Sequence, residues 1–298
     1  MIAPAPLATA QEAEMRPREF ERIRSMAYEF CGVDLSGKQI LVSSRLGKKI
    51  RELKLTSFTS YCDQVEQDKS GNMFTDMIDA LTTNHTSFFR EVRHFDFLRD
   101  TILPELPEAN PINIWSAACS SGEEPYTIAF SVIDALGEAA YSKLAITATD
   151  ISTRVLGKAR QGVYPLASIS AVTPLMRREC LMKGVGKFSD QCLVKPTVKK
   201  MIDFRQLNLL KDCSSVGPFQ VIFCRNVMIY FDQQTQQTVV NNLISRLLPG
   251  GYLLIGHAES LNGITHSLEY ICTATYRKPA NGGRPVAKQT SRFRMGTR

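Results

Sequence analysis

The sequence predicts an α/β protein in which a mostly parallel sheet follows an all-helical N-terminal domain. Residues 17–81 place apolar side chains at helical spacing, and after Pro111 short apolar runs alternate with helical segments. The run from Val221 to Cys224 has the length of a strand that is buried on both faces. Strands that alternate with helices are typical of a parallel sheet, so we expect a Rossmann-like domain.

The N-terminal helices are expected over residues 17–31, 37–55, 58–65 and 73–81. Pro17 suits the first turn of the first helix, and Gly32 lies just past its end. The second helix is predicted to turn five apolar residues inward: Ile40, Leu41, Leu46, Ile50 and Leu53. This helix and its surroundings are basic, with ten Lys/Arg against five Asp/Glu between Met15 and Lys54. Such a run is usually a solvated face.

The α/β part is predicted to hold strands at 112–117, 144–149, 221–224 and 252–256, with helices at 124–136, 152–161 and 233–248. Residues 270–277 alternate as an antiparallel edge strand does. Residues 184–203 interrupt this rhythm with turn residues and β-branched runs around Pro196, so we expect a small inserted antiparallel β-subdomain with Pro196 at an edge. The predicted domains are 15–90 and 91–278, between a disordered segment 1–14 and a disordered basic tail 279–298.

Composition narrows the function classes. The 298 residues carry a net charge of +7, which suggests an acidic partner without choosing among nucleic acid, anionic membrane and protein. Eight cysteines include no C-x-x-C pair, and four histidines show no metal-ligand spacing. We therefore expect free thiols, no metal and a cytoplasmic location. The start MIAPAPLATAQEA resembles neither a signal peptide nor an anchor, and no apolar run approaches the ~20 residues that span a bilayer.

The loop after the first predicted strand reads ACSSGEEPY, from Ala118 to Tyr126. Small residues and Gly122 let the backbone turn tightly and approach a ligand closely. The loop is not G-x-G-x-x-G, and Glu123 and Glu124 would repel a pyrophosphate. A carboxylate here favours a ligand with hydroxyl and amino groups but no phosphate, and S-adenosylmethionine (AdoMet) fits this description.

Two further strand ends point to the same pocket. Asp150 ends the second strand, where an acidic residue can accept hydrogen bonds from both ribose hydroxyls. A cap for the helix at 152–161 explains Asp150 equally well when it is considered alone. Arg225 and Asn226 follow the strand at 221–224, and ligands of open α/β sheets bind outside the carboxyl ends of the strands. The three signals together favour an AdoMet-dependent methyltransferase of class I.

These segments resemble the CheR family, the glutamate methyltransferases of chemotaxis receptors. The similar segments are LTTNHTSFFRE (81–91), WSAACSSGEEPY (115–126), ATDIS (148–152), NLL (208–210), FCRNVMIYFD (223–232) and GHAES (256–260). The resemblance covers about residues 16–277, and its most specific parts are 223–232 and the N-x-T-x-F-F-R segment. It implies a helical N-terminal domain joined to an AdoMet-binding α/β domain that bears a small β-subdomain.

The resemblance also implies a set of site residues. The cofactor contacts would be Asn84, Thr86, Arg90, Glu124, Asp150, Asn208, Leu209, Arg225 and Asn226. Arg90 and Tyr230 would be the catalytic residues. Arg90 would orient a carboxylate through its planar fork, either that of the substrate or that of AdoMet. Tyr230 would stand near the transferred methyl, with its hydroxyl aligning the substrate or its ring packing on the cofactor.

The implied reaction moves the methyl of AdoMet to a glutamate side chain and leaves S-adenosylhomocysteine. A glutamate with an ordinary pKa near ~4.3 is already anionic at neutral pH, so no general base is required. The expected substrates are the glutamate-rich cytoplasmic helices of chemoreceptors. Four cationic residues are candidates for binding these helices: Arg45, Lys48, Lys49 and Arg51.

Other partners and functions stay open at this point. The β-subdomain is either a structural hairpin or a place where a C-terminal receptor peptide adds as a strand. A methyltransferase of nucleic acid is disfavoured, because Arg225-Asn226-Val227-Met228 stands where an Asn-Pro-Pro-Tyr type motif is expected. An AdoMet-binding adaptor without turnover is the second alternative. We expect a monomer, with no nucleic acid partner and no membrane insertion.

Overall fold

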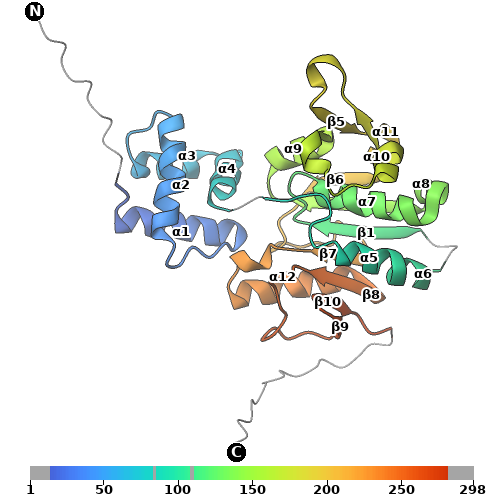
Figure 1. The fold of residues 1–298 in the computed structure, drawn as a ribbon. Coiled ribbons are helices and arrows are strands. Elements are labelled where there is room, and N and C mark those ends of the chain that lie inside the picture. Colours follow the sequence, from blue (N-terminus) through green and yellow to red (C-terminus); the bar gives the residue numbers. More distant parts are fainter. Residues whose placement is uncertain (1–13, 83–84, 108–110, 281–298) are drawn as a thin grey trace, which may run out of the picture. The chain divides into compact units, whose positions relative to one another are not determined.

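The computed structural model describes residues 14–82, 85–107 and 111–280 (Figure 1). The chain divides into two compact units, Met1–Thr83 and Asn84–Arg298. Asn84, the segment 1–13 and the tail from residue 281 lie outside the described residues, so the predictions made for them stay predictions.

The first unit consists of four helices: α1 (Pro17–Cys31), α2 (Gln39–Glu52), α3 (Phe58–Gln67) and α4 (Asn72–Leu81). Glu19 caps the start of α1 by accepting a hydrogen bond from the backbone N–H of Arg16 at 2.7 Å. Gly32 ends α1 in the left-handed conformation, with φ of 72°. The helical prediction for this region is confirmed.

The inward face of α2 differs from the prediction. Val42, Leu46 and Ile50 form a stripe at intervals of four residues and are buried. Ile40, Leu41 and Leu53 lie off this stripe and are 88%, 37% and 42% exposed, so the prediction that they point inward is wrong. Leu46 and Ile50 were assigned correctly. The sequence window alone did not show which of two adjacent apolar stripes the neighbouring helices cover.

The second unit is built on a seven-stranded sheet with the order β6-β2-β1-β7-β8-β10-β9. Its strands are β1 (Ile112–Ala117), β2 (Leu144–Asp150), β6 (Ile202–Gln206), β7 (Phe219–Cys224), β8 (Leu247–Ile255), β9 (Glu269–Cys272) and β10 (Thr275–Arg277). The first five strands in this order pair in parallel, and β10 and β9 pair antiparallel. The predicted mostly parallel α/β sheet is therefore confirmed. The single edge strand expected at 270–277 is a hairpin of two strands, because the chain turns at Ala274 with φ of 59°.

Both faces of the sheet are covered. Val221 and Phe223 of β7 belong to one hydrophobic cluster, and Ile222 and Cys224 belong to the other. The helices of this unit are α5 (Arg93–Phe97), α6 (Leu103–Glu105), α7 (Glu123–Leu136), α8 (Ala140–Lys143), α9 (Thr153–Gln161), α10 (Pro174–Cys180), α11 (Pro196–Lys199) and α12 (Gln233–Arg246). Residues of α7 and α9 contribute to the first cluster, and residues of α12 to the second.

A separate three-stranded antiparallel sheet has the order β3-β5-β4, with β3 (Val163–Pro165), β4 (Leu181–Lys183) and β5 (Gln191–Val194). This small sheet begins earlier than the predicted insertion at 184–203. Residues 202 and 203 instead begin β6, which pairs with β2 in the main sheet. Pro196 does not occupy a strand edge; it starts α11, where its fixed φ suits the first helical turn.

Candidate active site

The predicted site residues follow four adjacent strands of the main sheet. Strands β6, β2, β1 and β7 are neighbours and run parallel, so their carboxyl ends lie at one edge. The residues that the sequence assigned to the cofactor and that follow these ends are Glu124 after β1, Asp150 in β2, Asn208 and Leu209 after β6, and Arg225 and Asn226 after β7. The topology therefore brings together residues that are far apart in the sequence.

The loop after β1 has an unusual backbone. Ala118, Ser120 and Gly122 all have positive φ, at 61°, 49° and 97°. The side chain of Asp150 holds this loop, because its Oδ2 accepts a hydrogen bond from the N–H of Ser120 at 2.8 Å. A Cβ at Gly122 would lie 2.8 Å from Cβ of Ala159, so only glycine fits there.

Asp150 is not the cap of α9. Its Oδ1 accepts from the N–H of Ser152 at 2.9 Å, and it is Ser152 whose hydroxyl accepts from the N–H of Val155 at 3.3 Å. Asp150 thus sits between the β1 loop and the start of α9. Its carboxylate lies at the end of β2, and its role on a ribose stays a prediction.

The loop itself carries two acidic residues, Glu123 and Glu124. Glu123 accepts a hydrogen bond from the hydroxyl of Ser121 at 2.7 Å, and Glu124 accepts one from the hydroxyl of Ser116 at 2.7 Å. Burial raises the pKa of Glu124, while the charge of Arg225 acts in the opposite direction. The stretch from Ala118 to Tyr126 contains no Lys or Arg. These carboxylates are hydrogen-bond acceptors, so they fit AdoMet, which has hydroxyl and amino groups but no phosphate.

Arg225 lies at the centre of a buried ionic cluster. Its side chain is 2% exposed and pairs with Glu91 Oε2 at 2.9 Å and Glu124 Oε2 at 3.0 Å. Its guanidinium also donates to the carbonyl of Arg90 and lies 5.3 Å from the ring centre of Phe95. The cluster joins the end of β7 to the start of α7 and to the segment around Arg90.

Glu91 is a site residue that the sequence analysis did not single out. Besides Arg225, it accepts hydrogen bonds from Nδ2 of Asn226 at 3.3 Å and from the N–H of His257 at 3.2 Å. The only sequence signal was its position at the end of the segment LTTNHTSFFRE. Glu91 fixes the side chain of Asn226, which the resemblance assigned to the cofactor.

Glu259 is a second residue that was missed. Its carboxylate accepts hydrogen bonds from the backbone N–H groups of Gly256, Asn226 and Met228 at 2.6, 2.9 and 2.8 Å. Burial raises the pKa of Glu259, and these hydrogen bonds oppose that effect. They also hold Asn226 in the left-handed region, with φ of 58°. Glu259 lies in the segment GHAES, but no sequence pattern predicts that its carboxylate accepts hydrogen bonds from these backbone N–H groups.

The remaining predicted residues occupy different surroundings. Arg90 donates from Nη1 to the carbonyl of His85 at 2.9 Å, and Thr86 is half-buried. Tyr230 ends a short 3-10 helix, Met228–Tyr230, and is half-buried. Asn208 accepts through Oδ1 from the N–H of Leu210 at 3.0 Å. Leu209 is buried in the second hydrophobic cluster, and Asn84 lies outside the described residues.

Two histidines that are distant in the sequence meet near this site. The rings of His94 and His257 pack edge to face with centres 4.7 Å apart. His94 is 2% exposed, and burial lowers its pKa to about 4. Local spacing did not reveal this pair, because one histidine lies on α5 and the other follows β8.

The cysteines at the ends of β1 and β7 are not poised as nucleophiles. Cys119 and Cys224 are buried, and burial raises the pKa of both thiols. All eight cysteines are free thiols, as the sequence predicts, and Cys272 is exposed.

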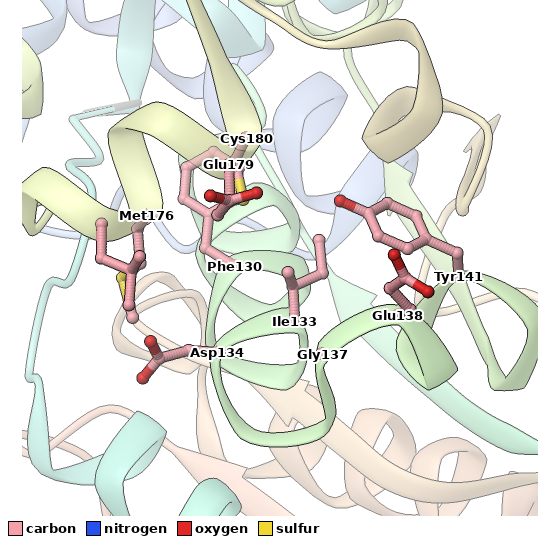
Figure 2. A pocket seen from close by; sticks show the side chains of 10 residues that line it. Phe130, Ile133, Asp134, Gly137, Glu138, Tyr141, Met176, Glu179 and Cys180 are labelled. Carbon is pink, nitrogen blue, oxygen red and sulfur yellow. The ribbon is translucent and has the colours of Figure 1, made fainter.

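A pocket of about 260 Å³ lies away from this edge, beside the carboxyl-terminal half of α7 (Figure 2). Phe130, Ile133, Leu175 and Met176 contribute apolar lining, with carboxylates that include Glu179 around it. The lining contains none of the predicted site residues, which follow the carboxyl ends of the strands.

Fold and site together define an AdoMet-dependent methyltransferase. A sequence model of the family described as "CheR methyltransferase, SAM binding domain" matches residues 84–277, and "CheR methyltransferase, all-alpha domain" matches residues 18–82. The chain belongs to the CheR methyltransferase family.

Curated relatives cover nearly the same length. The chain is 37% identical to chemotaxis protein methyltransferase 2 of Pseudomonas aeruginosa over 92% of this chain and 97% of that protein. It is 40% identical to the chemotaxis protein methyltransferase of Borreliella burgdorferi, over 87% and 94% of the two chains. The Escherichia coli chemotaxis protein methyltransferase is 38% identical over 86% and 89%.

No helix within residues 14–82, 85–107 and 111–280 is long and apolar enough to cross a membrane.

Proposed function

We propose that this protein transfers the methyl group of AdoMet to glutamate side chains in the cytoplasmic domains of chemoreceptors. The observation that carries the proposal is the convergence of Glu124, Asp150 and Asn226 at one edge of the sheet, in a chain of the CheR methyltransferase family. The names of the relatives link them to chemotaxis. The protein would work in the cytoplasm, as a monomer and without a metal in the methyl-transfer step.

Cofactor binding is assigned to residues at the ends of β1, β2, β6 and β7 and in the segment before Arg90. Asp150 would accept hydrogen bonds from ribose hydroxyls, since its carboxylate ends β2 beside the loop after β1. Asn208, Leu209 and Asn226 would contact the adenosine or methionine part from β6 and β7. Thr86 and Asn84 would close the pocket from the segment that leads to Arg90. Glu124 and Arg225 would mainly hold each other in position, because their side chains form an ion pair.

When it is bound, AdoMet supplies an electrophilic methyl on its sulfonium. The glutamate substrate is anionic at neutral pH, so the protein needs to position a carboxylate oxygen rather than remove a proton. Arg90 would orient a carboxylate, and Tyr230 would line the place of transfer. Alignment of this kind can contribute ~7–11 kcal/mol to lowering the barrier.

The first unit would dock on the receptor through α2. Lys48 and Arg51 are exposed on this helix, whereas Lys49 pairs with Asp76 at 3.2 Å and Arg45 donates to the carbonyl of Leu81 at 2.6 Å. Of the four cations proposed for receptor binding, Lys48 is therefore the first to test. The exposed side chain of Ile40 adds an apolar contact at the start of the same helix.

Charge reversal tests this docking surface. We expect Lys48→Glu to raise KM for a receptor fragment several-fold at low salt, with kcat unchanged. Charges at the rim of an interface mainly change the rate at which the two proteins associate. Lys69→Glu is the matched control, since Lys69 is exposed in the same unit but lies outside α2. Equal KM values for the two variants would remove α2 from the proposal.

The small sheet offers a second receptor contact. Strand β4 is an edge of this sheet, and the connection to β5 exposes Val185 and Phe188, which are 81% and 51% exposed. A C-terminal receptor peptide would add as a strand beside β4. Pulldown with receptors that lack their C-terminal peptide tests this contact, and undiminished capture would leave the sheet with a structural role.

An adaptor that binds AdoMet without turnover is the competing function. Both functions require AdoMet binding, so binding alone does not separate them. Formation of S-adenosylhomocysteine in the presence of a receptor cytoplasmic fragment does. The proposed enzyme forms it in many turnovers, and an adaptor forms none.

A further inference from the structure

A carboxylate and two imidazoles gather beside the ionic cluster of Arg225. One ligand atom from each of Glu91, His94 and His257 lies within 4.8 Å of the other two. Nδ1 of His94 is 3.6 Å from Oε2 of Glu91. Glu91 precedes α5, His94 lies in its first turn, and His257 follows β8, so two separate segments contribute to the group.

The ring nitrogens of the buried His94 make no hydrogen bond within the part of the chain that the structure describes. The residue is 2% exposed. Buried polar atoms are nearly always satisfied, and an unsatisfied one costs free energy on folding. His257 is exposed and packs against His94, so the buried ring adjoins a side chain that reaches solvent.

We propose that Glu91, His94 and His257 form a binding site for a divalent transition metal such as Zn²⁺ or Co²⁺. Two imidazole nitrogens and one carboxylate oxygen are ligands that these ions accept, with further positions left to water. A metal at His94 would satisfy a nitrogen that is otherwise unpaired. The exposed ring of His257 gives the ion a route from solvent.

The charges around the site allow an additional cation. Glu91 and Glu124 both pair with Arg225, so two carboxylates share the one positive charge of its guanidinium. Glu91 also accepts from Nδ2 of Asn226 and from the N–H of His257. A metal would therefore compete with Arg225 for Glu91 and disturb the hydrogen bond to Asn226. We expect metal binding to lower methyl transfer, which makes this an inhibitory site.

Cobalt titration tests the site without relying on activity. The full chain is treated with a chelator, freed of it, and titrated with Co²⁺ alone while its visible absorption and heat of binding are recorded. The Cys272→Ser background removes the exposed thiol as a competing ligand. We expect one equivalent of Co²⁺ to bind and to produce the visible bands of cobalt with nitrogen ligands.

The variants assign the ligands. His257→Ala should weaken Co²⁺ binding by about tenfold or more, a loss that even outer-shell changes cause in metal sites. His257 is exposed, so this variant should fold, and His94→Gln tests the buried ligand in parallel. His266→Asn is the control, because His266 lies outside the group and its Nδ1 accepts from the N–H of Leu268. Equal Co²⁺ affinity in the parent and His257→Ala, or no stoichiometric binding at all, would overturn the proposal.

Discussion

Arg225 and Glu124 are 101 positions apart in the sequence and form an ion pair of 3.0 Å at the carboxyl edge of the sheet. Their side chains are 2% and 12% exposed, so the pair is largely removed from water. The other oxygen of Glu124 accepts from Ser116 at 2.7 Å. The pair connects the end of β7 with the first turn of α7, at the edge of the sheet where the proposed cofactor residues gather.

Replacing the cation of this pair should destabilise the protein. Arg225→Met leaves the carboxylates of Glu91 and Glu124 without their partner, and such a loss costs about 3–5 kcal/mol. Urea unfolding followed by circular dichroism measures the change. Arg178→Met is the control, because Arg178 pairs with Glu179 at 2.9 Å on the surface and should contribute at most about 1 kcal/mol. Similar losses in the two variants would contradict a structural role for Arg225.

The backbone of Asn226 depends on the absence of a side chain at Gly256. A Cβ at Gly256 would lie 2.5 Å from Nδ2 of Asn226 and 2.8 Å from Oε2 of Glu259. Gly256→Ala should therefore weaken AdoMet binding about tenfold, which is about 1.4 kcal/mol, as measured by calorimetry.

Gly157→Ala is the control for this change. A Cβ at Gly157, within α9, would meet no atom within 4 Å, so the variant should keep its affinity for AdoMet. It should also gain about 0.5–1 kcal/mol of helix stability. An unchanged affinity in Gly256→Ala would mean that Asn226 does not contact the cofactor.

Arg90 is proposed to orient a carboxylate during transfer. Arg90→Ala should lower kcat/KM for methyl transfer by about a hundredfold, a loss typical of misplaced reactants, while the fold stays intact. Arg93→Ala is the control, since Arg93 is exposed three residues further along the same segment. Turnover of Arg90→Ala near that of the parent would exclude this role. Weaker AdoMet binding in the variant would assign the arginine to the cofactor, and unchanged binding with a higher KM for receptor would assign it to the substrate.

Much of the fold was predictable because its strands are buried on both faces. The apolar runs at β1 and β7 are bounded by polar residues, and each is followed by a long segment with helical apolar spacing, α7 or α12. The hairpin of β9 and β10 was not resolved from the sequence, since β9 is exposed along its length and alternates without a strong turn signal. The exposure of Ile40 was likewise not predictable, because periodicity within one helix does not specify which of its apolar residues the neighbouring helices cover.

The candidate site was predictable only in part. Asp150 ends β2, and Arg225 and Asn226 follow β7, so the sequence placed them correctly at the edge of the sheet. Their contacts with a cofactor stay predictions. Glu91 and Glu259 act through hydrogen bonds to residues from other segments, and no local pattern reports such contacts. The pairing of His94 with His257 likewise depends on how α5 packs beside β8.

Glu19 gives the first unit a pH-dependent contribution to stability. Burial raises its pKa, but hydrogen bonds from the N–H of Arg16 and the hydroxyl of Thr59, each at 2.7 Å, outweigh burial and leave the pKa below 4.5. The unfolded chain then binds the proton more tightly, so this contribution is present above pH 4.5 and is lost as the pH falls through the folded pKa.

Glu19→Gln should therefore cost on the order of 1 kcal/mol at neutral pH, with a smaller difference from the parent in acid. Thermal unfolding of Glu19→Gln and the parent, at neutral pH and in acid, measures the difference in stability under each condition. Glu21→Gln is the control, because Glu21 forms an exposed pair with Arg24 and should show little effect. A difference that is as large in acid as at neutral pH would contradict the assignment.

The central claim is methyl transfer to glutamate, and labelled AdoMet tests it most directly. The protein is incubated with methyl-labelled AdoMet and a glutamate-rich receptor cytoplasmic fragment, and the washed fragment is treated with mild alkali. A glutamate methyl ester releases its label as methanol under these conditions, and we predict this release. A fragment whose acceptor glutamates are replaced by alanine should release none. Label that stays on the fragment in alkali, or AdoMet binding without any transfer, would contradict the account.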